Sequence, residues 1–214
     1  MADRMLGEYA VRQLLGRGGM GEVWEGYDPD LDRRVAIKVI LPHLSNDPTF
    51  SERLRREAKL VAALRQPNIV QLYDFDIVDG QAIMVMEYLA GGSLRDRLAR
   101  LQNAGQLMAL TTAADLLEAV AAGLDYAHAR GAVHRDLKPG NILFSEEDKP
   151  IIGDFGVAKV VNASSNLTTP TLAGPGSILG TPAYMSPEQA GAGEIDHRSD
   201  LYALGVVLYE IVTG

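Results

Sequence analysis

Residues 134–141 read HRDLKPGN and include the side chains that are best suited to chemistry. Asp136 could accept the proton of an alcohol, and Lys138 could neutralise the charge of a phosphate. The amide oxygen of Asn141 could ligate Mg²⁺. An ordinary charged surface loop could also contain an Asp-x-Lys pair, but the order of the whole stretch favours phosphoryl transfer.

A second candidate metal ligand lies 18 residues beyond Asp136. Asp154 follows an apolar strand expected over residues 150–153 and precedes Phe155 and Gly156. A carboxylate between a strand and a Phe-Gly pair is a good metal ligand on a mobile hinge. The Asp-Phe-Gly triplet is common by itself, but the triplet together with Asp136 at this spacing is a specific signal.

A glycine-rich segment lies near the start of the chain. Gly16, Gly18 and Gly21 form GxGxxG, which is also found in dinucleotide-binding folds. In those folds the glycine loop opens a helix, whereas here Val23 and Trp24 belong to a β-prone run. We therefore predict two strands joined by a loop whose backbone amides lie over phosphates, with Val23 packed on a base. A tight hairpin without a ligand is the alternative.

One charged side chain interrupts an otherwise apolar strand. Lys38 lies in the strand expected over residues 34–40, where an amine needs a partner. The helix expected from residue 47 to 65 places Glu57 inside its apolar face. That face consists of Leu54, Ala58, Val61 and Leu64. We predict that Lys38 and Glu57 are partners, although the sequence does not show that they meet.

The remaining elements follow from apolar periodicity and from turn residues. The first part of the chain is expected to form a sheet of about five strands with one helix. Its strands are expected at 9–15, 22–27, 34–40, 69–76 and 82–88. After a flexible joint at residues 89–92, helices are expected at 93–102, 111–130 and 201–212.

These motifs together resemble the bacterial eukaryotic-like (Hanks-type) Ser/Thr protein kinases, and the resemblance covers the chain from Tyr9 onward. It implies an α+β, two-lobed kinase fold with a small antiparallel sheet lobe carrying one helix and a mainly helical, incomplete second lobe. The implied domains are 1–87 for the first lobe, 88–92 for the hinge and 93–214 for the second lobe.

The resemblance implies a role for each candidate residue. Asp136 would orient and deprotonate a Ser or Thr hydroxyl of a protein substrate, and Lys138 would stabilise the transferring phosphoryl group. Lys38 would hold the phosphates of ATP, with Glu57 as its partner. The Mg²⁺ ligands would be Asn141 and Asp154. The nucleotide would contact Gly16, Gly18, Gly21, Val23, Ala36, Lys38, Glu87, Leu89 and Leu143.

The segment after Asp154 resembles a kinase activation loop, and its composition alone indicates a flexible loop. A phosphate added there could pair with Arg135 and order the segment. We predict phosphorylation at one of three threonines, Thr168, Thr169 and Thr171. By the same resemblance, Thr181 together with Lys138 favours Ser/Thr over Tyr as the acceptor. Asp200 would brace the backbone of residues 134–141, and a simple helix N-cap is its alternative.

The composition excludes several classes of protein. The 214 residues are 47% apolar and 22% charged, as in a folded globular protein, and the formal charge of -8 argues against a general nucleic-acid binder. The absence of cysteine excludes disulfides, Cys-ligated zinc and thiol catalysis. Residues 1–9 lack a signal-peptide core, and the apolar stretch 201–212 is too short to span a bilayer. We expect a cytoplasmic protein with no membrane segment in this chain.

Kinase domains of this family usually continue for several helices beyond the one expected at 201–212. We therefore expect a truncated domain, whose last helix exposes apolar surface and promotes self-association. The main hypothesis is an ATP-dependent Ser/Thr kinase that phosphorylates proteins, including its own activation loop. The alternative is a nucleotide-binding interaction module without turnover. A dinucleotide-dependent oxidoreductase fails because a strand follows the glycine loop and no βαβ unit places an acidic residue.

Overall fold

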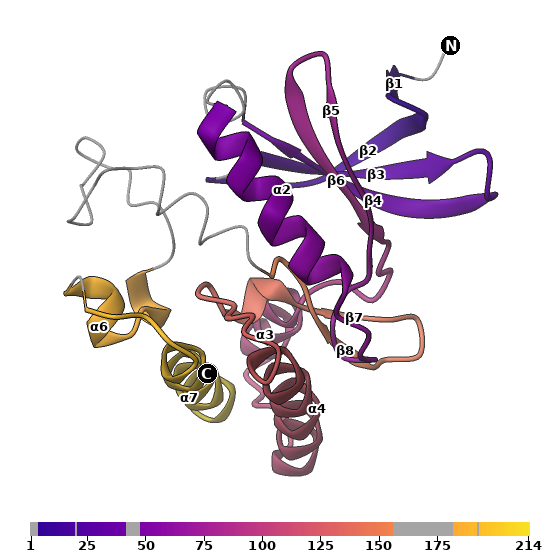
Figure 1. Ribbon diagram of the computed structural model, residues 1–214. Coiled ribbons are helices and arrows are strands. Elements are labelled where there is room, and N and C mark those ends of the chain that lie inside the picture. The colour runs from indigo at the N-terminus through magenta and orange to yellow at the C-terminus, as the bar shows by residue number, and fades with distance from the viewer. Residues whose placement is uncertain (1–3, 20, 42–47, 156–181, 192) are drawn as a thin grey trace, which may run out of the picture. The chain divides into compact units, whose positions relative to one another are not determined.

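A computed structural model describes residues 4–19, 21–41, 48–155, 182–191 and 193–214. The chain forms two compact units (Figure 1). The first contains Met1–Arg65 and Gln71–Tyr88, and the second contains Gln66–Val70 and Leu89–Gly214. The chain therefore crosses between the units three times, after Arg65, after Val70 and after Tyr88.

The first unit is built on a six-stranded sheet in which all neighbouring strands are antiparallel. Its strands are β1 (Arg4–Leu6), β2 (Tyr9–Gly18), β3 (Gly21–Asp28), β4 (Arg33–Ile40), β5 (Leu72–Val78) and β6 (Gln81–Glu87). Their order is β1-β2-β3-β4-β6-β5. The sheet has one strand more than expected, because β1 pairs with β2, and a strand of three residues leaves little periodic signal in a sequence.

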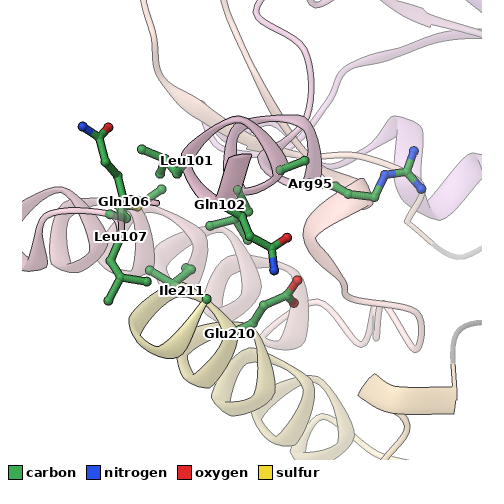
Figure 2. A pocket seen from close by; sticks show the side chains of 11 residues that line it. Arg95, Leu101, Gln102, Gln106, Leu107, Glu210 and Ile211 are labelled. Carbon is green, nitrogen blue, oxygen red and sulfur yellow. The ribbon is translucent and has the colours of Figure 1, made fainter. Parts of the chain in front are cut away.

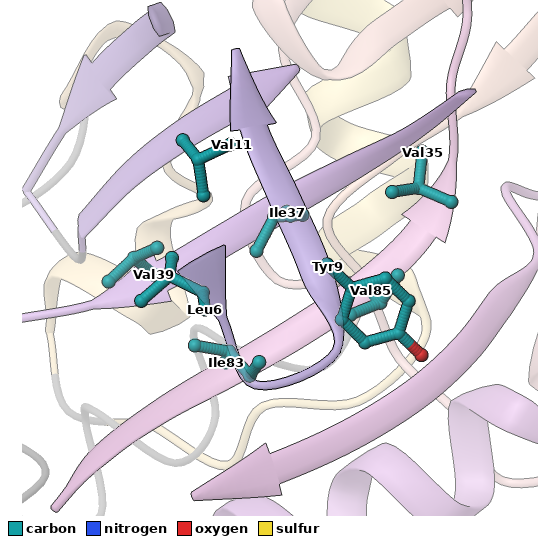
Figure 3. Packing of buried hydrophobic residues seen from close by; sticks show 8 residues of the cluster. All are labelled: Leu6, Tyr9, Val11, Val35, Ile37, Val39, Ile83 and Val85. Atoms are coloured by element: carbon teal, nitrogen blue, oxygen red, sulfur yellow. The ribbon is translucent and has the colours of Figure 1, made fainter. Parts of the chain in front are cut away.

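An apolar cluster within the first unit packs one side of β4 against β1, β2 and β6 (Figure 3). Its members are Leu6, Tyr9, Val11, Val35, Ile37, Val39, Ile83 and Val85. Because side chains alternate along a strand, Val35, Ile37 and Val39 face this cluster while Ala36 and Lys38 face the other side of the sheet. The cluster therefore holds the strand that carries Lys38.

The strand expected over residues 69–76 is wrong at its start, since β5 begins at Leu72. The preceding backbone bonds to β8 (Pro150–Ile152) instead. Val70 N donates to Ile152 O at 2.9 Å, and Ile152 N donates to Asn68 O at 2.8 Å. Residues 66–70 belong to the second unit, where β8 satisfies the N–H of Val70 and the carbonyl oxygen of Asn68.

Helix α2 (Pro48–Ala62) contacts β5 within the first unit. Leu54, Ala58 and Val61 are buried, and so is Leu64 just beyond the helix, which confirms the predicted apolar face. Glu57 is partly exposed beside this face. Residue 47, where this helix was expected to begin, lies outside the described residues.

The second unit is mainly helical. Its elements are α3 (Leu94–Asn103), α4 (Leu110–His128), η1 (Pro139–Asn141), β7 (Ile142–Phe144), β8, η2 (Pro182–Tyr184), α6 (Pro187–Ala190) and α7 (Arg198–Thr213). Helix α4 contacts β8 and α7. Leu116, Val120 and Leu124 of this helix are buried, whereas Leu117 is partly exposed. Gly123 allows the close approach, because a Cβ there would lie 2.9 Å from Ile152 Cδ1.

Local signals define the ends of these helices. Ser93 caps α3, as its Oγ accepts from Asp96 N at 3.2 Å while the Asp96 carboxylate accepts from Ser93 N at 3.1 Å. Gly131 follows α4 with a φ of 75°, in the left-handed region that favours glycine after a helix. In the part of the chain that the structure describes, no helix is long and apolar enough to cross a bilayer.

Candidate active site

Asp200 anchors the backbone of residues 134–141. Its Oδ2 accepts from His134 N at 2.8 Å, and its Oδ1 accepts from Arg135 N at 2.8 Å. The ring Nε2 of His128 lies 2.7 Å from the same carboxylate. The predicted brace is therefore confirmed. The N-cap alternative is wrong, because His197 holds the cap position and Asp200 lies in the first turn of α7.

The Asp200 carboxylate is fully buried yet ionised. Burial raises its pKa, but the hydrogen bonds from His128 and from the backbone N–H groups of His134 and Arg135 favour the charged form. The pKa of Asp200 consequently lies below its ordinary value. At neutral pH a buried negative charge therefore holds two successive N–H groups just before Asp136.

His134 joins the same loop to the strand before Asp154. Its ring is completely buried, with Nε2 2.7 Å from Gly153 O and Nδ1 3.2 Å from Asp136 N. A carbonyl oxygen can only accept and a backbone N–H can only donate, so the ring is neutral with its proton on Nε2. The ring edge also packs on Phe155, with centroids 4.8 Å apart. His134 thus fixes the segments of Asp136 and Asp154 relative to each other.

The side chains of Lys138 and Asn141 converge on the carboxylate of Asp136. Lys138 Nζ lies 2.7 Å from Asp136 Oδ2. Asn141 Nδ2 donates to Asp136 O at 2.8 Å and to Asp136 Oδ2 at 3.3 Å. The Asp136 and Lys138 side chains are 26% and 24% exposed, so the pair is held in place but open to a reactant.

The predicted metal ligands Asn141 and Asp154 lie on adjoining segments, because Gly153 N donates to Asn141 O at 2.8 Å. The Asn141 amide nitrogen bonds to Asp136, which leaves the amide oxygen as the atom that could bind a metal. An amide oxygen and a carboxylate suit Mg²⁺, which uses few protein ligands and completes its shell with phosphate and water. No trio of His, Cys, Asp or Glu that could hold a metal alone occurs among the described residues.

Two non-glycine residues next to these groups have left-handed backbone conformations. Arg135, which precedes Asp136, has φ 68°, and Asp154 has φ 59°. Such conformations cost about 1–3 kcal/mol each and persist only where surrounding contacts impose them. The contacts of Asp200 and His134 provide that constraint, and backbone strain of this kind is concentrated at functional sites.

In the first unit, the glycine pattern lies in the β2–β3 hairpin, which confirms the predicted strand, loop and strand. Gly18 pairs with Gly21, and Gly16 pairs with Val23. A Cβ at Gly21 would lie 2.0 Å from Val39 O, so the hairpin itself requires this glycine. A Cβ at Gly16 or Gly18 would have no described heavy atom within 4 Å. These two glycines are not required by the packing of the unit, which suggests that they leave room for a ligand.

Lys38 lies on β4 opposite Val23 of β3 and Met84 of β6, so these three side chains share one face of the sheet. Ala36, two positions earlier, lies on the same face. Only 5% of Lys38 is exposed, and burial of an amine is costly without compensation. The ion pair of Lys38 with Glu57 stays a prediction.

The other predicted nucleotide contacts lie at the ends of strands. Glu87 is the last residue of β6, and its N–H donates to Gln71 O at 2.9 Å, so a base could only use its carbonyl oxygen. Leu89 follows in the second unit and is partly exposed. Leu143 of β7 is partly exposed and forms an isolated bridge with Ser93.

The family model for the protein kinase domain matches residues 9–214. The chain belongs to the protein kinase family. PknA, a Ser/Thr protein kinase of Mycobacterium tuberculosis, is 43% identical over 213 residues, which cover 97% of this chain and 47% of PknA. A probable Ser/Thr protein kinase PknB of Bifidobacterium longum is 40% identical over 217 residues, covering 97% of this chain and 30% of that protein.

A comparison with solved structures also finds a protein kinase. The crystal structure of the PknI kinase domain of Mycobacterium tuberculosis matches with a TM-score of 0.77 and 28% identity, covering 99% of this chain and 77% of that one. The two-lobed kinase fold, in partial form, is thereby confirmed. The kinase domain described here spans less than half of the length of the curated relatives PknA and PknB.

Several contacts of the kinase domain were not predicted. Gln189 Nε2 donates to Arg135 O at 2.7 Å, and Ser186 Oγ, completely buried, donates to Ser199 Oγ at 3.1 Å. Ser199 also hydrogen-bonds to Glu188. The polar residues of the SPEQ sequence at 186–189 were the available signal, but their partners lie on other elements, which the sequence does not identify. The predicted phosphorylation sites and Thr181 lie outside the described residues.

A pocket of about 260 Å³ opens in the second unit between α3 and the end of α7 (Figure 2). Arg95, Leu101 and Gln102 line it from α3, and Glu210 and Ile211 line it from α7. The pocket contains none of the predicted site residues. It therefore contributes nothing to the assignment of the reaction.

Proposed function

We propose that this chain transfers the γ-phosphoryl group of ATP to Ser and Thr hydroxyls of proteins. The observation that carries the proposal is the convergence of Lys138 and Asn141 on the carboxylate of Asp136, on a loop whose backbone is bound by Asp200. PknA is a Ser/Thr protein kinase and the Bifidobacterium longum PknB is named a probable one, which does not favour the alternative of a binding module without turnover.

In the proposed reaction, Asp136 acts on the acceptor. Its carboxylate accepts a hydrogen bond from the Ser or Thr hydroxyl and takes the proton as the hydroxyl oxygen bonds to the γ-phosphorus. The bond from that phosphorus to the bridging oxygen breaks, and ADP leaves with the electron pair. Lys138, which lies beside Asp136, stabilises the charge on the phosphoryl oxygens during transfer.

The remaining predicted residues would bind the nucleotide and the metal. Asn141 and Asp154 offer the oxygen ligands of Mg²⁺, which when bound neutralises phosphate charge. Lys38, with Glu57 as partner, would bind phosphate oxygens. The residues proposed to surround ATP are Gly16, Gly18, Gly21, Val23, Ala36, Glu87, Leu89 and Leu143.

Arg135 supports the proposed regulation by phosphorylation. Its Nε is buried and has no hydrogen-bond partner among the described residues. A buried guanidinium nitrogen of this kind is suited to a phosphate, which offers several strong acceptors. We propose that phosphate on Thr168, Thr169 or Thr171 binds Arg135.

Incubation of residues 1–214 with ATP and Mg²⁺ tests the function. We expect intact-mass spectra to show additions of phosphate, and peptide mapping to place them within residues 156–181. No addition is expected with EDTA present or with ADP in place of ATP. A folded chain that binds ATP but gains no phosphate and phosphorylates no added protein would contradict transfer and favour the binding module.

The glycines of the β2–β3 hairpin give a second test. Gly18→Ala is expected to raise the KM for ATP about tenfold, a loss of roughly 1.4 kcal/mol, without changing the melting temperature. Gly21→Ala is expected to lower stability by about 1–3 kcal/mol, because its Cβ would overlap Val39 O. Thermal unfolding without nucleotide, compared with steady-state kinetics, separates the two effects. Equal loss of stability in both variants would show that Gly18 is structural.

A further inference from the structure

Gln189 makes two different contacts from the short helix α6. Its Oε1 accepts from Ser186 N at 3.0 Å, which completes a capping box with Ser186 Oγ. Its Nε2 donates to Arg135 O at 2.7 Å. The orientation of the amide follows from its partners, because a backbone N–H requires an acceptor and a carbonyl requires a donor. One side chain thus links α6 to the loop of Asp136.

The contact reaches the peptide group directly before Asp136. Gln189 holds the carbonyl oxygen of that group, while His134 Nδ1 accepts from its nitrogen, Asp136 N, at 3.2 Å. On the other side of Arg135, the preceding N–H is bound by Asp200 at 2.8 Å. The left-handed conformation of Arg135 is therefore constrained on both sides, and a rotation of this peptide plane would move Cα and the carboxylate of Asp136.

We propose that Gln189 is a positioning residue for Asp136, which transmits the placement of residues 182–190 to the site of proton transfer. This inference rests on the proposed function of Asp136. The hydrogen bond to Arg135 O would make the orientation of the Asp136 carboxylate depend on the placement of residues 182–190.

Gln189→Glu separates the two contacts of this residue. The Glu carboxylate can still accept from Ser186 N, so the capping box and α6 are preserved. The Glu carboxylate cannot donate a hydrogen bond, so the bond to Arg135 O is lost and two acceptor oxygens face each other. We expect kcat for peptide phosphorylation to fall about 10- to 100-fold, as for other losses of orientation, while the KM for ATP stays within about twofold of the parent value.

Gln106→Glu is the matched control. It introduces the same charge at an exposed position of the same unit, in the loop between α3 and α4. Its kcat and melting temperature are expected to equal those of the parent. A merely structural role of Gln189 would instead lower the melting temperature of the Gln189→Glu variant and leave kcat per folded molecule unchanged, and this result would overturn the proposal.

Amide hydrogen exchange without nucleotide provides a readout that needs no turnover. Faster exchange at His134, Arg135 and Asp136 is expected in Gln189→Glu, with no change in Gln106→Glu. Unchanged exchange together with unchanged kcat would overturn the proposal. If the parent chain transfers no phosphate but exchange still responds, the proposed function fails while the link between α6 and the loop stands.

Discussion

Asp136→Asn is expected to reduce phosphoryl transfer about 100- to 10,000-fold, the range over which a positioned general base accelerates reactions. Asn has the shape of Asp but cannot take a proton from the acceptor hydroxyl. The hydrogen bond from Asn141 Nδ2 to the backbone oxygen of Asp136 is retained, so the loop should keep its conformation. Phosphate incorporation per minute, followed by intact mass, measures the effect.

Glu147→Gln is the matched control for this change. Glu147 pairs with Lys149 at 2.6 Å, with the same two-residue spacing as Asp136 and Lys138, but both members of this pair are exposed on the surface. Neutralising Glu147 should leave the rate unchanged. A rate for Asp136→Asn within tenfold of the parent, in a folded chain, would contradict the assignment of Asp136 as the base.

Asp200→Asn is expected to lower the free energy of unfolding by about 2–3 kcal/mol and to reduce transfer as well. The carboxylate accepts from His134 N, Arg135 N and His128 Nε2. An Asn side chain has one acceptor oxygen and an NH₂ group, so at least one of these buried donors loses its partner. Urea unfolding gives the change in stability, and phosphate incorporation gives the change in rate.

Asp196→Asn provides the comparison at a partly exposed aspartate near the start of the same helix, α7. Asp196 pairs with Arg198 at the surface, where ion pairs contribute little. Its replacement should leave the urea midpoint unchanged. Equal midpoints for the Asp200→Asn chain and the parent would show that the buried carboxylate does not hold the loop.

Acid titration adds a second signature of Asp200. Its pKa lies below the ordinary carboxyl value in the folded chain, since the bonds from His128 and the loop outweigh the effect of burial, which raises it. Its contribution to stability is therefore complete above the unfolded pKa and is lost as the pH falls through the folded pKa. The Asn variant should show a smaller loss of stability with acid than the parent.

The sequence by itself determined the residues that could perform the reaction. Asp136, Lys138 and Asn141 lie within one short loop, so their types and spacing largely define what they can do together. The glycine hairpin and the apolar face of α2 were also predictable, because turn chemistry and helical periodicity are local properties. The resemblance to kinases then predicted Asp200 as a brace for the loop.

Only the tertiary structure decided how that loop is held. His134 meets Gly153, Asp200 meets His128, and Gln189 meets Arg135, in each case between elements well separated in the chain. Residues 66–70 pair with β8 for the same kind of reason. Backbone groups and buried side chains must find hydrogen-bond partners wherever packing places them, and no periodic pattern in a sequence records which distant group that will be.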